Sequence, residues 1–320
     1  MEVLIWGTGN MARIHSARLA RRTDVTITAV ISRRGGGETL PGAAGGRILS
    51  GPEELETLPR RPDLAVICLP GDLHRPAAEA LMGRVPHILC EKPAALSLED
   101  AAAMADRAEE TGTTLSVAQV LRSWDAYEAL SHRLTAGRER LHTLSLWRRQ
   151  PRPDWSEGSW LADPKRSGGV LFDLAIHDVD YVVSLFGPPE RVEASGGPGG
   201  ESVTLFLRYP TFCAVLYASW CLPAGFASGL EAGVEAAFTD EVIRFDSRLS
   251  SDRWRRYTSR GMEEERFPTW DPYGRQLDTL LEELRGGHWP GRLDIRPAGG
   301  RTDFRLSMRM HFNKSKTRGE

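Results

Sequence analysis

Hydrophobic residues in the first 120 positions form short continuous runs separated by segments with helical spacing. The runs at 2–6, 25–31, 64–69, 87–90 and 114–118 are typical of parallel strands buried on both faces. Helices are expected from residue 11, from Pro76 to about Gly83, and from Ser97 to Glu110. We expect Ser97 to cap the third helix and Gly112 to end it. This alternation predicts a doubly wound parallel sheet over residues 1–120.

The pattern changes after residue 120. A helix is expected over 124–135, a strand over 141–149, a loop over 150–164 and a second helix over 168–186. Strands are then expected at 190–195, 202–209, 213–221, 229–237 and 241–246, followed by a helix over 273–285 and a helical tail over 302–315. Successive strands joined by short turns predict a large, mostly antiparallel open sheet. We therefore expect a second domain over residues 121–320.

Composition narrows the class of protein. The chain has 320 residues, 41% of them hydrophobic and 26% charged, with a net charge of −2, which gives no reason to expect nucleic acid or a membrane as partner. The apolar run at 3–6 follows the first residues without a leader pattern, so we expect a cytoplasmic protein. Cys68, Cys90, Cys213 and Cys221 form no C-x-x-C pair and lie in apolar stretches, so reduced core cysteines are expected, and no metal site.

A glycine-containing turn follows the first strand directly. Its residues are Gly7, Thr8, Gly9, Asn10, Met11 and Ala12, and helical spacing begins at once. Gly7 suits a tight turn, and Gly9 lets the backbone approach a pyrophosphate at a helix N-terminus, which predicts a dinucleotide site.

The end of the second strand suggests which dinucleotide is bound. An NAD site usually has an acidic residue there, to hold the ribose hydroxyls. This chain has Ser32, Arg33 and Arg34, a hydroxyl and two guanidiniums that suit a 2′-phosphate. NADP(H) is therefore expected over NAD(H), with NAD(H) as the alternative cofactor. A solvated strand end is the alternative interpretation of the arginines, and we expect it to hold for one of the two.

The other strand ends of this half carry unusual residues. Ligands of doubly wound sheets bind at the carboxyl ends of the strands. We therefore expect further cofactor contacts from Leu69, Pro70, His74, Glu91, Lys92 and Gln119. Capping a turn is an equal alternative for His74, and His15 on the first helix is expected to pack or to face solvent.

The segment from Ser167 to Asp180 begins with two glycines and continues at helical spacing. Asp173 and His177 are four residues apart, on one face of a regular helix. A carboxylate beside an imidazole suits proton transfer. A helix N-terminus with an acidic first turn and a packed histidine would have the same residues. The segment alone therefore leaves both interpretations open.

These features in this order resemble the glucose–fructose oxidoreductase / inositol dehydrogenase / rhizopine catabolism family, Gfo/Idh/MocA. The resemblance rests on the turn at 7–12, on Glu91-Lys92-Pro93, on 119–122 and on Gly168-Gly169 through Asp173 and His177. It implies a cis Lys92–Pro93 peptide, and it implies that Lys92, Asp173 and His177 surround the nicotinamide and the reacting carbon.

The resemblance implies an N-terminal NAD(P)-binding Rossmann domain over residues 1–120, followed by an α/β substrate-binding and oligomerisation domain over residues 121–320. It also implies an NAD(P)-dependent oxidoreductase of sugars, cyclitols or related polyols that forms a homodimer or homotetramer through the large sheet. His177 is the candidate acid–base group, Asp173 either orients its ring or holds a neighbouring hydroxyl, and Lys92 polarises the substrate oxygen or carries the proton itself. Arg122 and Trp160 are the expected substrate contacts, and Trp124 and Trp155 are further candidates for the wall of a sugar pocket. Packing is the commoner role for each of these tryptophans. Asp180 is either structural or a substrate contact. Reduction of a non-sugar carbonyl or imine, and a non-catalytic NAD(P) sensor, remain as alternatives.

Overall fold

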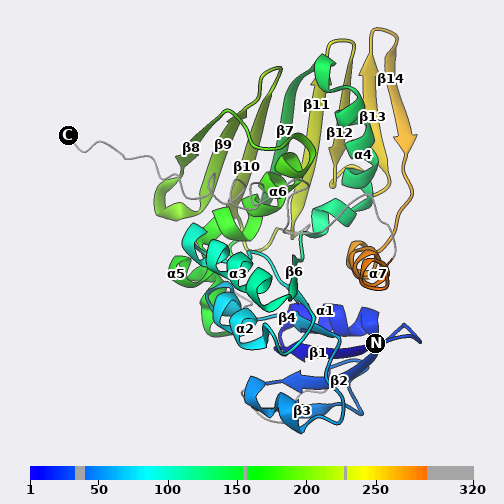
Figure 1. Ribbon diagram of the computed structural model, residues 1–320. Coiled ribbons are helices and arrows are strands. Elements are labelled where there is room, and N and C mark those ends of the chain that lie inside the picture. Colours follow the sequence, from blue (N-terminus) through cyan, green and yellow to red (C-terminus); the bar gives the residue numbers. More distant parts are fainter. Residues whose placement is uncertain (33–39, 154–156, 227–228, 287–320) are drawn as a thin grey trace, which may run out of the picture. The chain divides into compact units, whose positions relative to one another are not determined.

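The computed structural model describes residues 1–32, 40–153, 157–226 and 229–286. The chain divides into two compact units, one formed by Met1–Gln119 together with the helix from Tyr273, and the other by Val120–Pro272. Figure 1 shows the elements of both units coloured along the sequence. No helix among the described residues is long and apolar enough to cross a membrane.

The first unit contains a six-stranded parallel sheet. Its strands are β1 (Glu2–Trp6), β2 (Thr26–Ile31), β3 (Arg47–Leu49), β4 (Leu64–Ile67), β5 (His87–Cys90) and β6 (Thr114–Val117). Their order is β3-β2-β1-β4-β5-β6, the doubly wound arrangement predicted from the sequence. Each residue of β4 is buried, as expected of a continuous apolar strand between two layers.

The helices between the strands of this unit are α1 (Asn10–Leu19), α2 (His74–Leu81) and α3 (Leu98–Thr111), with short 3₁₀ turns at Pro52–Thr57 and Gly71–Leu73. The Ser97 hydroxyl accepts the Asp100 N–H at 3.0 Å, and Gly112 adopts a left-handed conformation, so both predicted ends of α3 are confirmed. The short strand β3 was not expected, and α2 begins at His74 rather than at Pro76.

The second unit contains an eight-stranded sheet. Its strands are β7 (Leu141–Pro151), β8 (Arg191–Gly196), β9 (Ser202–Arg208), β10 (Cys213–Leu222), β11 (Glu231–Phe238), β12 (Glu241–Asp246), β13 (Arg253–Thr258) and β14 (Gly261–Arg266). Their order is β14-β13-β12-β11-β7-β10-β9-β8. The pairing of β7 with β10 is parallel and the other pairings are antiparallel, which confirms the expected mostly antiparallel sheet.

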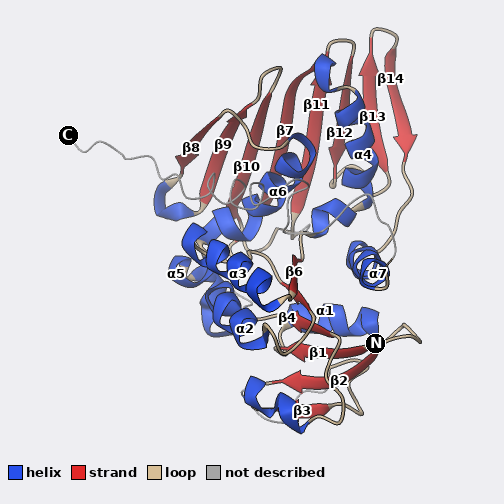
Figure 2. Cartoon of the chain, in the orientation of Figure 1, coloured by secondary structure: helices blue, strands red, loops and turns tan. Residues whose placement is uncertain are grey.

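The helices of the second unit are α4 (Asp125–Ala136), α5 (Pro164–Ser167) and α6 (Ile176–Phe186). Figure 2 shows α4 and α6 lying along one face of the sheet. The core of the unit fills the space between these helices and the sheet, with Tyr127 and Tyr181 among its fully buried side chains.

Strands β13 and β14 were not predicted, because their sequences are dominated by charge. Arg255 lies opposite Glu264, and Arg256 opposite Glu263. The Arg253 and Arg255 guanidiniums approach Glu264 to 3.0 and 3.3 Å. Opposite charges across a hairpin satisfy each other, so a stretch that resembles a solvated loop is a regular pair of strands.

The segment before α6 is not a regular α-helix. Residues Leu171–Ala175 form a π-helical turn, with i→i+5 hydrogen bonds. The expected helix over 168–186 is therefore interrupted at its start. The spacing argument that placed Asp173 and His177 on one face assumed α-helical geometry throughout, so it does not apply to Asp173.

The expected second domain, residues 121–320, differs from the structure at one element. Helix α7 (Pro272–Leu284) packs in the core of the first unit, where Leu277, Leu280 and Leu281 are buried. Its buried leucines recur at three- and four-residue spacing, which gives the helix one apolar face. The expected helical tail over 302–315 lies outside the described residues.

The cysteines differ in burial. Cys90 is buried, Cys68 and Cys213 are half-buried, and Cys221 is exposed. The expectation of four core cysteines is therefore wrong for Cys221. Strand β10 is irregular at that position, because Cys221 and Leu222 both pair with Pro151.

Candidate functional site

The turn between β1 and α1 is built around Gly7. Its φ of +117° lies in a region that favours glycine, and a Cβ on it would lie 2.6 Å from the carbonyl oxygen of Cys68. A side chain at this position would therefore force β1 away from the end of β4. Ala12 is fully buried on α1, where a small residue allows the helix to pack closely on the sheet.

Gly9 stands immediately before α1 and is exposed. No described side chain caps it, the first turn of the helix contains no acidic residue, and no described atom lies within 4 Å of an ideal Cβ at Gly9. The first N–H groups of a helix attract anions. An uncapped helix N-terminus with open space beside its glycine therefore fits a dinucleotide pyrophosphate.

The residues expected to choose between the two dinucleotides are partly described. Ser32 is half-buried, and its backbone N–H donates to Leu49 O at 2.9 Å, which fixes the end of β2 beside β3. Arg33 and Arg34 lie outside the described residues.

The Glu91-Lys92-Pro93 segment follows β5, and the Lys92–Pro93 peptide is cis, as the resemblance implied. The Glu91 carboxylate is buried, with Oε1 2.6 Å from Nε2 of His15 and Oε2 accepting the Lys92 N–H at 3.2 Å. His15 is fully buried, and its ring meets the edge of Tyr273. His15 is therefore neither solvent-facing nor merely packed, because it pairs with the residue before Lys92.

His74 begins α2 and is 1% exposed. Its Nδ1 lies 2.7 Å from Pro93 O and its Nε2 lies 2.7 Å from Leu69 O. Burial lowers the pKa of His74, and the two carbonyl contacts oppose this shift. The imidazole therefore joins the end of β4 to the residue after Lys92.

Asp173 lies in the π-helical turn and is buried. Its Oδ2 lies 3.3 Å from Trp220 Nε1, on β10, and 3.5 Å from Gln150 Nε2, on β7. The indole N–H is the better placed donor, and it holds one carboxylate oxygen at the ends of two neighbouring strands. Neither Trp220 nor Gln150 was predicted, because they lie 47 and 23 residues from Asp173 along the chain.

His177 is half-buried in α6, and Asp178 follows it. Asp178 is 1% exposed and lies 3.0 Å from the guanidinium of Arg148, a residue of β7 that is also buried. Burial raises the pKa of Asp178, and the charge of Arg148 opposes this shift. A second nitrogen contact at 3.3 Å makes the pair bidentate, so it fixes the rotation of α6 on the sheet.

Asp180, two residues after Asp178 on α6, also forms an ion pair with an arginine. Its two oxygens accept from Arg122 at 2.8 and 2.6 Å. This contact gives Asp180 a structural role, one of its two expected roles. Arg122, expected to contact substrate, is a fixed cation with 28% of its side chain exposed.

The remaining candidates are less constrained. Trp160 is half-buried in the 3₁₀ segment Glu157–Ala162, and Trp124 packs against the core beside α4. Gln119, Leu69 and Pro70 are half-buried at the ends of β6 and β4. Trp155 lies outside the described residues. Among the described residues, no group of three His, Cys, Asp or Glu side chains is placed to hold a metal.

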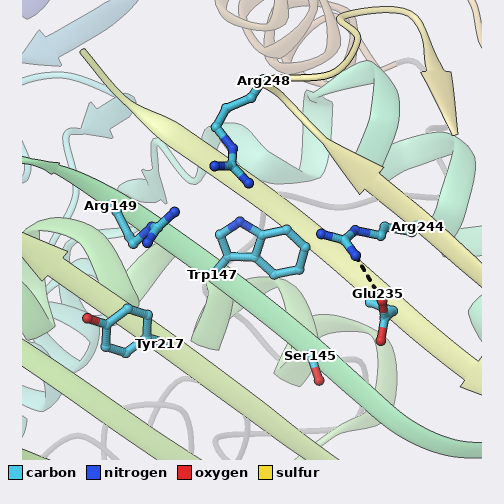
Figure 3. A pocket seen from close by; sticks show the side chains of 7 residues that line it. All are labelled: Ser145, Trp147, Arg149, Tyr217, Glu235, Arg244 and Arg248. Carbon is cyan, nitrogen blue, oxygen red and sulfur yellow. Dashed lines mark ion pairs between the residues drawn. The ribbon is translucent and has the colours of Figure 1, made fainter. Parts of the chain in front are cut away.

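A shallow pocket of about 300 Å³ lies elsewhere, on the face of the large sheet that points away from α6. Figure 3 shows the Trp147 indole between Arg149, Arg248 and Arg244, with the Arg244–Glu235 ion pair at its side. None of the predicted site residues lines this pocket, which is formed by Ser145, Trp147, Arg149, Tyr217, Glu235, Arg244 and Arg248.

Curated relatives match parts of the chain. It is 32% identical over 146 residues to 1,5-anhydro-D-fructose reductase of Ensifer adhaerens, which covers 44% of each chain. It is 26% identical over 218 residues to scyllo-inositol 2-dehydrogenase (NADP(+)) IolW of Bacillus subtilis (strain 168), covering 63% of this chain and 60% of the relative. The matches thus span about half the length of these relatives.

Solved structures share the whole fold. UDP-N-acetylglucosamine 3-dehydrogenase GnnA from Acidithiobacillus ferrooxidans matches with a TM-score of 0.76 and 21% identity, covering 97% of this chain and 94% of that one. Biliverdin reductase from Synechocystis sp. PCC 6803 matches with a TM-score of 0.74 and 16% identity, covering 97% and 96% of the two chains. At these identities the likeness shows the fold alone.

Two family models cover most of the chain. Residues 1–119 match the oxidoreductase family with an NAD-binding Rossmann fold, and residues 138–240 match the GFO/IDH/MocA C-terminal domain. The two matches follow each other in the order that the glycine turn and the antiparallel sheet predicted. The chain therefore belongs to the Gfo/Idh/MocA family of oxidoreductases.

Proposed function

We propose that the protein is an NADP(H)-dependent oxidoreductase acting on a hydroxyl or keto carbon of a sugar, cyclitol or related polyol. The observation that carries the proposal is the uncapped N-terminus of α1 beside Gly9, in the part of the chain that matches the NAD-binding model. Relatives named as an anhydrofructose reductase and a scyllo-inositol dehydrogenase support the substrate class.

The cofactor contacts are assigned to residues of the first unit. The backbone N–H groups after Gly9 hold the pyrophosphate, while Thr8, Asn10 and Met11 line the same turn. Ser32, Arg33 and Arg34 receive the 2′-phosphate, which is the basis for preferring NADP(H). The two named NADP(+)-dependent scyllo-inositol dehydrogenases of Bacillus subtilis support this preference.

The chemistry is assigned to Lys92, Asp173 and His177. When bound, the nicotinamide supplies or accepts the hydride. His177 moves the proton of the substrate hydroxyl, because an imidazole changes charge near neutral pH. Asp173, held by Trp220, accepts a hydrogen bond from a neighbouring substrate hydroxyl or from the His177 ring. Lys92 donates to the reacting oxygen and stabilises its developing charge.

The cofactor assignment is tested with two glycine variants. A methyl group at Gly9 or at Gly45 meets no described atom within 4 Å, so neither Gly9→Ala nor Gly45→Ala should clash within the protein. Gly9→Ala is expected to weaken NADPH binding, measured by fluorescence titration, and Gly45→Ala is the matched control. Equal affinities would contradict the pyrophosphate assignment. Tighter binding of NADH than of NADPH by the wild-type protein would contradict the predicted preference.

The substrate class is tested by turnover. Reduction of NADP⁺ is measured with scyllo-inositol, and oxidation of NADPH with 1,5-anhydro-D-fructose and a panel of ketosugars. Turnover of any of them supports the proposal. Tight NADPH binding without turnover of any carbonyl or polyol would favour the sensor alternative.

We also propose that the outer face of the large sheet binds a second copy of the chain. This face carries the exposed Phe206, Tyr217, Tyr257 and Met262, with exposed fractions between 36% and 51%, beside Trp147. A broad exposed apolar face with aromatic and arginine side chains is typical of protein interfaces. Its arginines are paired with carboxylates on the same face, as Arg244 is with Glu235, so the face does not carry a block of unpaired positive charge at that position.

The oligomer is tested by light scattering after size exclusion. The double variant Phe206→Glu/Tyr217→Glu is expected to reduce the mass toward that of one chain, 35.4 kDa. Ile48→Glu, which changes an equally exposed residue of β3, is the control. A wild-type protein of 35.4 kDa would overturn the proposal.

A further inference from the structure

Two buried histidines act on the backbone that carries Lys92, one on each side. On the amide side, His15 holds Glu91, whose other oxygen accepts the Lys92 N–H at 3.2 Å. On the carbonyl side, His74 lies 2.7 Å from Pro93 O. His15, Glu91 and His74 are 0%, 6% and 1% exposed, so these contacts form away from solvent.

We infer that His15, Glu91 and His74, here called the lysine clamp, are positioning residues that fix the backbone of Lys92 for its role in the reaction. This inference rests on the proposed function of Lys92. None of the three needs to touch substrate to act in this way. Their action passes through the peptide groups on either side of the lysine.

Composition supports a specific role for the clamped residue. The chain contains 37 arginines and four lysines, at positions 92, 165, 314 and 316. A cation in this protein is therefore almost always an arginine. Both cations donate hydrogen bonds. An ammonium can also give up its proton, whereas a guanidinium stays protonated in proteins. Lys92 is therefore an exception to the preference of this chain for arginine, and the lysine clamp would hold its backbone in place.

The contacts of His74 suggest a matched pair of substitutions. The amide nitrogen of an asparagine lies near the position of histidine Nδ1, and that of a glutamine near Nε2. A neutral imidazole donates from only one of its two nitrogens. His74→Asn keeps a nitrogen donor toward Pro93 O and places none toward Leu69 O, whereas His74→Gln does the reverse. The two variants separate anchoring of the lysine peptide from anchoring of the strand end.

A first measurement follows Lys92 without substrate. Reductive ¹³C-methylation of the full chain gives few lysine resonances in NMR, and the Lys92 resonance is assigned by its loss in Lys92→Arg. His74→Gln is expected to shift this resonance and His74→Asn to leave it in place. His15→Leu is expected to shift it as well, whereas His15→Gln, which keeps a donor for Glu91, leaves it. A Lys92 resonance that responds alike to Asn and Gln would overturn the clamp.

A second measurement uses turnover of scyllo-inositol with NADP⁺. His74→Gln is expected to lower kcat about tenfold or more, with the KM for NADP⁺ unchanged, because small displacements of a catalytic group are costly. In a Lys92→Ala background the same substitution should have no further effect. A loss that persists without Lys92 would overturn the inference. Full activity of Lys92→Ala would instead remove the proposed role of Lys92, while the NMR result still decides whether the clamp exists.

Discussion

The two units hold their candidate catalytic residues by different means. In the first unit, neutral peptide groups around Lys92 are held by buried side chains, at Glu91 and His74. In the second unit, the helix that carries His177 is held by two carboxylate–guanidinium pairs, Arg148–Asp178 and Arg122–Asp180. The second arrangement pairs both acids that follow His177 on α6, Asp178 and Asp180, with a guanidinium. The difference predicts that removing either guanidinium of the second unit costs stability, whereas removing the anchors of Lys92 in the first unit costs turnover.

The largest expected effect on stability comes from Arg148→Met. It leaves the Asp178 carboxylate buried without its cation, which costs about 3–5 kcal/mol in free energy of unfolding. The measurement is urea denaturation. Arg148→Met/Asp178→Leu removes both charges and should recover most of the loss. A single variant as stable as the double variant would contradict the role given to this pair.

Lys92→Ala and His177→Ala are expected to change rate rather than stability. Each should slow turnover by about a hundredfold or more, the usual scale of acid–base catalysis. The assay is NADP⁺ reduction with scyllo-inositol, accompanied by circular dichroism to confirm folding. Near-normal rates in both variants would refute the assignment of these residues.

Arg122→Met is expected to cost less than Arg148→Met. The Arg122 side chain is 28% exposed, so water stabilises the Asp180 carboxylate in part when the guanidinium is removed. We expect a loss of about 1–2 kcal/mol, between the values for surface and buried pairs. Urea denaturation of Arg122→Met and Arg148→Met under the same conditions compares the free energy lost at the partly exposed pair with that lost at the buried pair. A larger loss for Arg122→Met would reverse the ranking of the two pairs.

The smallest effect is a change in pH dependence caused by His74. Burial lowers its pKa below the ordinary 6.5, so between these values the unfolded chain binds a proton that the folded chain does not. The free energy of unfolding therefore falls as pH drops below about 6.5, by at most about 1.4 kcal/mol per pH unit for one group. Denaturation of wild type and His74→Asn between pH 7 and 5 should give a shallower slope for the variant. Parallel slopes would contradict a lowered pKa of His74.

The sequence was sufficient to predict the fold where the pattern of apolar residues matches the burial in the structure. The parallel strands of the first unit are continuous apolar runs, and glycines such as Gly7 and Gly112 mark turns that other residues adopt with strain. It failed at β13 and β14, where arginine and glutamate pair across a hairpin and hide its strand character. It also failed at the π-helical turn, because the change from i→i+4 to i→i+5 hydrogen bonds is not visible in the residue types of this segment.

For the candidate site, the sequence located the residues but not their partners. Asp173 was chosen from its neighbours in the chain, whereas Trp220 and Gln150 reach it from distant strands. His15 on α1 and Glu91 after β5 are 76 residues apart along the chain and meet only in the folded unit. Contacts between remote residues have no local signal in a single sequence.

Helix α7 has a consequence for how the protein is made. Its leucines Leu277, Leu280 and Leu281 complete the core of the first unit, yet they are translated after residues 120–272. When residues 1–119 have been synthesised, α7 is still missing, so part of the apolar surface of the first unit is uncovered. We expect the emerging chain to keep that surface exposed through the synthesis of about 150 more residues, which makes it a natural target for chaperones.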